Sequence, residues 1–254
     1  MRVLCWIMVA HAGPSLTWED IEAAKAPAPI SIQVDHPRPL QDVLARLAKE
    51  FGVFTTYEDV WPLPPSKQEV RVPGGDPLPI GGRLDIQVPA EDLKHPARLV
   101  QHVVDLHHAA GHPGTFQVSA QGARIHVLPV THPTEAGEAP VTRLLDTPVD
   151  VSGRGINALQ IAQAITEELS LRTDKQVSLY PWSTHPALQE PLPATARPEG
   201  PMPARKALAL ALDGVSGIRV SWQLISTPDG LQHGLNLFTL CDPTETEAVL
   251  CPGG

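Results

Sequence analysis

The pattern that most constrains the fold occurs twice along the chain. In each half, alternating apolar and polar residues, typical of a strand, lead into a stretch whose apolar residues recur at helical spacing. A return strand, a proline-rich crossing, a second helix and a hairpin then follow in the same order. We therefore predict an α+β protein of two similar small sheet-and-helix units. Internal duplication, or convergence on one element order, would account for the similarity.

The first unit is predicted to span residues 30–130. Its first helix has clear ends, because Pro39 suits the first helical turn and Gly52 the C-terminal stop. The strand at 82–88 is expected in this half only. The predicted elements, in order, are strands at 30–37, 53–59 and 82–88, a second helix whose apolar stripe runs over 99–110, and a hairpin over 115–130.

The second unit is predicted to span residues 143–241, after a linker at 131–142. A C-terminal tail, 242–254, follows it. Pro228-Asp229-Gly230 is a strong turn signal for its hairpin. The predicted elements are strands at 144–153 and 175–182, helices striped over 158–169 and 208–215, and a hairpin over 218–240.

The N-terminus resembles a secretory signal peptide over residues 1–12. Arg2 precedes an apolar stretch over residues 3–10, which ends in an A-x-A-like cleavage site at 10–12. We therefore expect a periplasmic or secreted protein. A buried first strand is the alternative interpretation of the same residues.

The cysteines depend on this expectation. Cleavage would remove Cys5 and leave Cys241 and Cys251 near the C-terminus. In an oxidising compartment this pair is expected to form a disulfide that pins the tail. In a reducing cytoplasm both residues would be unpaired thiols.

Charge and hydropathy limit the classes of partner. The formal net charge is -9 at pH 7, without any run of Lys or Arg, so nucleic acid and anionic membrane surfaces are poor partners. No apolar run approaches the roughly 18 residues that a spanning helix needs, so we expect no membrane span in the mature chain. No cofactor-binding motif was found, and no cofactor is predicted.

The segments ISIQVDHP, PLQDVLARLAKEFG and GRLDIQV are followed by a second short helix and a hairpin. Through them, residues 30–130 resemble the short N-terminal domain of secretins and TonB-dependent receptors, and 146–240 resemble it more loosely. The resemblance implies a small periplasmic module that docks a partner protein through its sheet. The chain is also similar to uncharacterised exported proteins of soil bacteria that combine HPRPL, YED, PGTF and SWQL segments, which implies no activity.

Two proline-rich segments, YEDVWPLPP and LYPWSTHP, carry aromatic residues at matching points of the two halves. Aromatic rings on stiff loops make good contact anchors, and carboxylates supply acceptors. The alternative is that each Trp folds back on its own core, which the recurrence favours. The candidate binding residues are Tyr57, Glu58, Asp59, Trp61, Tyr180 and Trp182.

The segment QHVVDLHHAAGH contains the strongest candidate for chemistry. On a helix, Asp105, His108 and His112 share one polar face, and imidazole with carboxylate suits Zn²⁺. Against a metal site, Gly111 and Pro113 predict that the helix ends before His112. A solvated polar face or a pH-sensitive contact are the alternatives.

No nucleophile elbow, phosphate-binding loop or suitably spaced carboxylate pair is found, so we predict no catalytic residue. The sequence favours a non-catalytic interaction module that binds a protein of the bacterial cell envelope, by adding a strand to a sheet edge or by docking on the sheet face. A small-molecule or glycan-binding protein, with the aromatic residues in a cleft between the units, is the competing class. A metal-dependent hydrolase at the histidines is the third.

Overall fold

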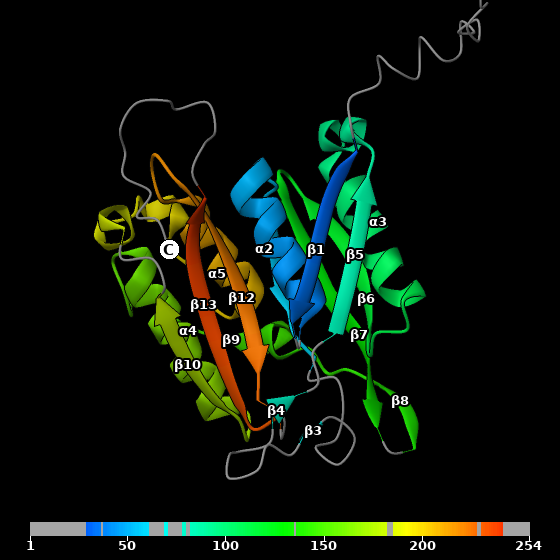
Figure 1. Cartoon of the computed structure of the whole chain (residues 1–254). Coiled ribbons are helices and arrows are strands. Elements are labelled where there is room, and N and C mark those ends of the chain that lie inside the picture. Colours follow the sequence, from blue (N-terminus) through cyan, green and yellow to red (C-terminus); the bar gives the residue numbers. More distant parts are fainter. Residues whose placement is uncertain are drawn as a thin grey trace, which may run out of the picture.

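The computed structural model describes residues 29–36, 38–60, 69–70, 78–79, 82–134, 136–181, 185–227 and 230–240. Within them the chain has an α+β fold, as predicted, in which helices pack between a large mixed sheet and two smaller sheets (Figure 1). The predicted signal segment 1–12, the tail 242–254, and the residues Trp61, Trp182, Cys241 and Cys251 lie outside the described residues.

The first half encloses two helices between two layers of strands. Its small sheet is one antiparallel pair, and its part of the large sheet has three main strands, to which β8 (Gly137–Pro140) is added by pairing with β7. The small sheet consists of β1 (Ile30–His36) and β5 (Gly82–Val88), the helices are α2 (Pro39–Phe51) and α3 (Pro96–Ala109), and the three strands are β2 (Thr55–Glu58), β6 (Thr115–Gln121) and β7 (Arg124–Thr134).

The second half has the same layers. Its small sheet is β9 (Pro148–Val149) with β11 (Met202–Pro203), its helices are α4 (Ala158–Arg172) and α5 (Ala204–Asp213), and its strands are β10 (Gln176–Pro181), β12 (Arg219–Ser226) and β13 (Gln232–Leu240). Short elements complete the described residues: β3 (Glu69–Val70), β4 (Leu78–Pro79), β8 (Gly137–Pro140), and the 3₁₀ helices η2 (Ala90–Lys94), η3 (Leu144–Asp146), η4 (Pro186–Gln189) and η5 (Ala194–Ala196).

The two halves share one topology. In each, the return strand runs parallel to the second hairpin strand, giving the order β2-β7-β6 in one half and β10-β13-β12 in the other. The small sheets β1–β5 and β9–β11 also correspond. The expectation that residues 82–88 form a strand without a counterpart is therefore wrong. Their counterpart β11 is only two residues long and ends in Pro203, which has no N–H to donate.

The predicted strand at 144–153 is also much shorter than expected. Residues 144–146 form the 3₁₀ helix η3, and only Pro148 and Val149 pair with β11. The predicted ends of α2 are confirmed: the helix begins at Pro39, and Gly52 after it adopts the left-handed conformation, with φ 66°.

The halves join edge to edge into a single sheet. β12 pairs in parallel with β2, so the strand order is β10-β13-β12-β2-β7-β6. The order of equivalent strands is kept across this junction, but their directions are reversed. The halves are therefore related by a half-turn about an axis that crosses the strands, which places their helices on opposite faces of the sheet (Figure 1).

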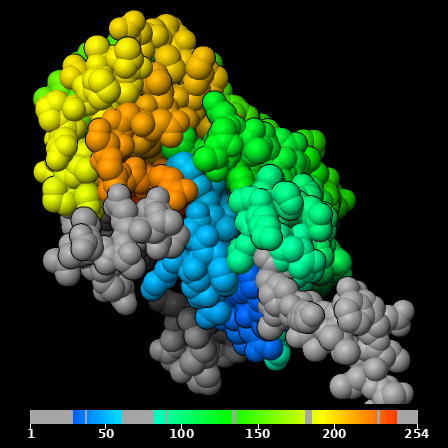
Figure 2. All heavy atoms as spheres, turned by 90° about the horizontal axis from the view of Figure 1, so that it is seen from above, coloured from blue at the N-terminus to red at the C-terminus, as the bar shows by residue number. Residues whose placement is uncertain are grey.

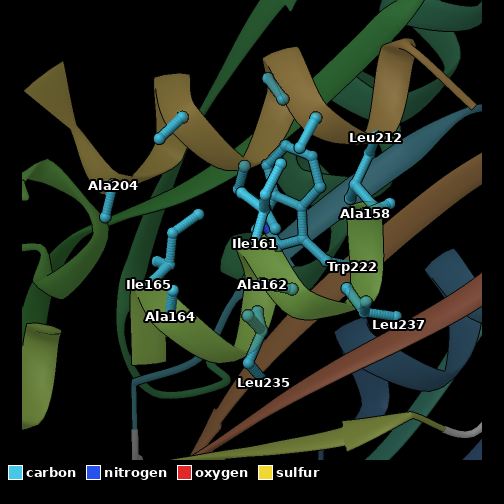
Figure 3. Close-up of a cluster of buried hydrophobic side chains, with 14 of the residues drawn as sticks. Ala158, Ile161, Ala162, Ala164, Ile165, Ala204, Leu212, Trp222, Leu235 and Leu237 are labelled. Atoms are coloured by element: carbon cyan, nitrogen blue, oxygen red, sulfur yellow. The ribbon is translucent and has the colours of Figure 1, made fainter. Parts of the chain in front are cut away.

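Each half has its own hydrophobic core between helices and strands. In the second half, Trp222 of β12 is fully buried against both helices. Small alanine side chains on α4 and α5 allow the helices to approach the indole closely. Figure 3 shows this cluster, with Trp222 surrounded by Ile161, Ala162, Ile165, Leu212, Leu235 and Leu237. No helix in the described part of the chain is long and apolar enough to cross a membrane.

We expect Trp222→Ala to lower the free energy of unfolding by about 3–5 kcal/mol, because it removes the largest buried side chain of the second core and leaves a cavity. Urea denaturation followed by circular dichroism would measure the loss. Leu171→Ala, at a position that is 79% exposed on α4, is the control and should change stability by less than about 0.5 kcal/mol. A loss at Trp222 no larger than at Leu171 would contradict this packing.

Candidate functional site

The junction between β2 and β12, which we call the seam, contains the Tyr57-Glu58-Asp59 segment. Tyr57 pairs with Gln223 and Glu58 with Leu224, and the Asp59 N–H donates to the Leu224 carbonyl at 2.8 Å. All three residues of the segment are buried. They cannot meet a partner at the surface, so the interpretation of Tyr57, Glu58 and Asp59 as surface contacts is corrected: they hold the two halves together.

Glu58 forms a buried ion pair across the seam. Arg205 of α5 donates from Nε at 2.8 Å and from Nη2 at 2.6 Å to one oxygen of Glu58, and it also contacts Asp146. Burial raises the pKa of the Glu58 carboxyl, although the Arg205 charge acts in the opposite direction. Arg205 is therefore the main group that compensates the buried carboxylate, with a smaller contribution from Arg143.

A second ion pair, Arg38 with Asp59, lies within the first half and contacts Ser226 across the seam. Arg38 donates from Nε to Asp59 at 2.7 Å and from Nη2 to the Ser226 carbonyl at 2.7 Å. The Tyr57 hydroxyl donates to the other Asp59 oxygen at 3.0 Å. Burial, and then the neighbouring Asp59 charge, raise the pKa of Tyr57 well above its ordinary value. Tyr57 is therefore a neutral donor within the seam.

Arg124 of β7 completes the seam on the face covered by α5. Its guanidinium contacts Asp213 at 2.8 Å and lies 4.6 Å from the ring centre of Phe54 and 4.8 Å from that of Trp222. Both halves thus supply charged and aromatic groups to one junction. Seen from above, the blue atoms of the first half lie directly against the orange atoms of the second (Figure 2).

The three predicted metal ligands have separate hydrogen-bond partners. Asp105 accepts from Gln101 at 2.8 Å, His108 Nε2 accepts from the Phe116 N–H at 3.0 Å, and His112 Nε2 contacts the Arg83 carbonyl oxygen at 3.0 Å. Because α3 ends at Ala109, His112 does not continue the helical face. Across the described residues, no group of three or more His, Cys, Asp or Glu could hold a metal ion.

Tyr180 lies apart from Tyr57. It is 55% exposed on β10, and its ring covers Gly234, where a Cβ atom would come within 2.9 Å of it. β13 and β12 separate β10 from β2 in the sheet, so Tyr57 and Tyr180 do not line a shared cleft. Of the six candidate binding residues, Tyr180 is the one among the described positions that remains accessible.

An open groove of about 730 Å³ lies beside β10, between this strand, α4 and the loop before α4. Apolar side chains line much of it, and Ile156 is 52% exposed. Arg154 at the rim is held by Glu167 and Glu168 at 2.6 and 2.9 Å. Sequence reasoning missed this groove, whose main apolar lining residues are Ile156, Leu159 and Leu179.

The outer edge of β6 carries unpaired backbone groups. The Phe116 N–H points away from β7, toward His108. Because backbone groups alternate in direction along an antiparallel strand, Val118 and Ala120 direct theirs outward too. Neither has a hydrogen-bond partner there among the described residues. The strand also contains no charged residue.

The outer edge of β10 is open over a shorter stretch. Ser170 Oγ donates to the Val177 carbonyl, at 3.2 Å, and accepts from the Val177 N–H, at 2.9 Å. Pro181 has no N–H to offer. Between them, Leu179 presents its N–H and C=O on the same side, beside the groove that its side chain helps to line. The described part of the large sheet thus ends in two outer edges, β6 and β10, at which a strand could be added.

No protein-family model matches this chain, and no curated protein or solved structure matches it either. The candidate sites therefore depend on the geometry of the described residues. That geometry separates a buried, charged seam from two open, uncharged edges. The edges and the groove, unlike the seam, are accessible to a partner.

We expect Arg205→Met to cost about 3–5 kcal/mol of unfolding free energy at pH 7, because it leaves the Glu58 carboxylate buried without its partner. The cost should shrink as the pH falls, since the raised pKa of Glu58 allows it to become neutral. Urea denaturation at several pH values would measure both effects. Adding Glu58→Leu should recover most of the loss, and Asp146→Asn is the control for the other Arg205 contact. Equal losses in the single and double variants would contradict the pairing.

We also expect stability to fall as the pH decreases below 6.5. Burial lowers the pKa of His107 from 6.5 to about 3, so in this interval the unfolded chain binds a proton that the folded chain does not. His107 alone should then contribute a loss of about 1.4 kcal/mol per pH unit. Urea denaturation at pH 7, 6 and 5 should show a shallower loss for His107→Gln than for the unmodified chain. The exposed His95, changed to Gln, controls for the substitution; identical slopes for all three proteins would refute the assignment.

Proposed function

We propose that this protein is a non-catalytic protein–protein interaction module of the bacterial cell envelope, and that it binds a partner by pairing strands along the open edges of its large sheet. The observation that carries the proposal is the outer edge of β6, where Val118 and Ala120 direct backbone groups away from the sheet. An added strand would satisfy these groups, as in other complexes formed by strand addition.

The limited protection of these edges supports the proposal. Proteins usually guard edge strands with lysine, proline, irregular register or a covering element. On β6, a hydrogen bond to His108 and a register shift after Thr115 hinder strand addition only at the first residues of the strand. On β10, Ser170 and Pro181 guard the two ends and leave Leu179 open. The unguarded residues are uncharged, so a partner strand would not have to bury unpaired charge.

The two halves of the chain are themselves joined by such strand pairing. At the seam, β12 joins β2 through a ladder of only two residue pairs, with adjacent side chains supplying further contacts. A short parallel ladder is therefore enough to join two sheets of this kind when neighbouring side chains fit. The groove beside β10 offers apolar surface for that purpose.

The sequence resemblance supports the location and the class of partner. Residues 30–130 resemble the short N-terminal domain of secretins and TonB-dependent receptors, which implies docking of another envelope protein on the sheet. The signal-like segment 1–12 agrees with a periplasmic or secreted location. We include both in the proposal.

A second candidate function is binding of a small molecule or glycan. The specific observation in its favour is the groove, whose volume of about 730 Å³ is typical of ligand pockets. Leu159 and Gln163 would supply apolar and hydrogen-bonding surface there, and Tyr180 is exposed nearby on β10. A glycan or metabolite that raises the melting temperature of the protein, but not that of an Ile156→Lys variant, would favour this function.

We expect Ala120→Pro to abolish partner binding without unfolding the protein. The outward N–H of Ala120 has no partner among the described residues, so proline removes only the donor that an added strand would use. Envelope proteins captured by the purified chain would be compared between variants by mass spectrometry. A partner lost with Ala120→Pro and kept with Ala120→Ser, at equal melting temperatures, is the expected result. Partners retained by all variants would exclude the β6 edge.

A further inference from the structure

We infer that the strand partner of this protein is a second copy of the same chain, with β6 of one molecule pairing in parallel with β10 of the next. The inference rests on the proposed function and specifies its partner. It follows from the internal symmetry of the fold: the contact that joins the two halves can be repeated between molecules.

The strands that meet at the seam have counterparts at the two open edges. β2 is the return strand of the first half and corresponds to β10, and β12 is the first hairpin strand of the second half and corresponds to β6. The contact between β12 and β2 therefore corresponds to a contact between β6 and β10. One chain cannot make that contact, because β6 and β10 lie at opposite edges of its sheet.

Strand direction agrees with this pairing. β6 and β10 both run antiparallel to β2, so they run in the same direction as each other. A second molecule placed in the same orientation at the end of the sheet would bring its β10 parallel to β6. The seam pair β12 and β2 is also parallel. The two contacts thus have the same geometry.

The open backbone groups also match in register. On β12, Val220, Trp222 and Leu224 face the core, as Phe116 and Val118 do on β6. In the two hairpins Leu224 pairs with Leu235 and Val118 with Val127, so Val118 corresponds to Leu224, whose carbonyl accepts a seam hydrogen bond, and Phe116 corresponds to Trp222.

On the return strands, Tyr57 and Leu179 occupy equivalent positions, since each pairs with a core residue of the neighbouring parallel strand: Val127 for Tyr57 and Leu235 for Leu179. Tyr57 uses its outward side to pair with β12, whereas Leu179 has no such partner among the described residues. Leu179, Val118 and the carbonyl of Phe116 are therefore placed to form the corresponding ladder, while the Phe116 N–H is held by His108.

The groove beside β10 is open, whereas at the equivalent place in the seam side chains of the first half contact β12. Arg38 and Gln41 of the first half contact β12, Gln41 through Gln223 at 3.0 Å. Leu40, Val43 and Leu44 on α2 have the same spacing and burial as Ala158, Ile161 and Ala162 on α4.

By this alignment, Arg38 corresponds to Ile156 and Gln41 to Leu159. Both Ile156 and Leu159 line the groove. The positions that hold β12 at the seam are thus apolar and accessible at β10, where β6 of another molecule would lie.

The carboxylates of the seam have uncharged counterparts on β10. By the same correspondence, Tyr180 stands in place of Glu58. The Arg38–Asp59 pair is replaced by Ile156 and Pro181. Contact between β6 and β10 would therefore bury neutral and apolar groups, without the desolvation cost of an ion pair.

The expected assembly is head to tail and open-ended. The contact uses two different surfaces, so each added molecule leaves one β6 edge and one β10 edge free. The ladder is short and includes no ion pair, so association should be weak and should increase with protein concentration. It should not stop at a dimer.

Sedimentation velocity of the purified full chain over a range of concentrations tests this inference. Species larger than a dimer should appear as the concentration rises. Ala120→Pro puts a proline ring at the next outward position of β6 after Val118, in the path of an added β10, and Ile156→Lys blocks the groove at β10, so each variant alone should remain monomeric. An equimolar mixture of the two should form a complex of two chains and nothing larger, because each supplies the edge that the other lacks. Ala120→Ser and Leu171→Lys are the matched controls and should associate like the unmodified chain.

Other outcomes distinguish this inference from the proposed function. Dimers of Ile156→Lys alone would indicate a symmetric contact between β6 edges and would overturn the head-to-tail arrangement. A chain that stays monomeric at all concentrations, while Ala120→Pro still loses a captured envelope protein, would overturn self-association and leave the proposed function standing. Absence of both self-association and edge-dependent capture would overturn both. Equal melting temperatures across the variants would exclude misfolding as the cause.

Discussion

The pairing of β2 with β12 is the interaction on which the rest of the structure depends. Without it, each half would be a separate sheet with its own helices and core. With it, the half-turn between the halves puts helices on both faces of a single sheet. Because burying ions is costly, Glu58 is tolerated at the seam only where the correct register brings it to Arg205 of the other half. Arg38 and Asp59, paired within the first half, add contacts with Ser226 in the same register. The seam therefore determines which two of the four unit edges join.

The pairing of β2 with β12 also determines which edges of the large sheet remain available to other molecules. Joining β12 to β2 leaves β6 and β10 at the ends of the sheet, one from each half. These two strands lack the charges of the seam. His108 and Ser170 bind backbone groups of β6 and β10, but each covers only part of its edge. Equivalent positions thus carry charged residues at the seam and uncharged residues at the outer edges. The seam is a permanent junction within the chain, whereas the outer edges suit a reversible contact. The proposed interaction role and the proposed self-association both depend on this difference.

Buried polar residues show where reading the sequence alone was misleading. Glu58 and Asp59 look like surface acceptors, because carboxylates are almost always exposed unless they are paired. Their partners Arg205 and Arg38 are distant in the sequence and give no local sign of the pairing. The Asp105, His108 and His112 pattern failed for a related reason: helical periodicity predicts a shared face, but the helix ends at Ala109 and each side chain finds a partner elsewhere.

By itself, the sequence determined the elements and their repetition. Apolar periodicity predicted the four helices of the described residues, Pro39 and Gly52 marked the ends of α2, and the order of elements revealed two similar units, because these features depend on local backbone and side-chain properties. The short strand β11 was missed, since two residues carry too little pattern. Only the tertiary structure decided that the units share one sheet and face opposite ways, that Glu58 and Asp59 lie inside the seam, and that β6, β10 and the groove at Ile156 stay open. These features depend on contacts between distant segments, which no local pattern specifies.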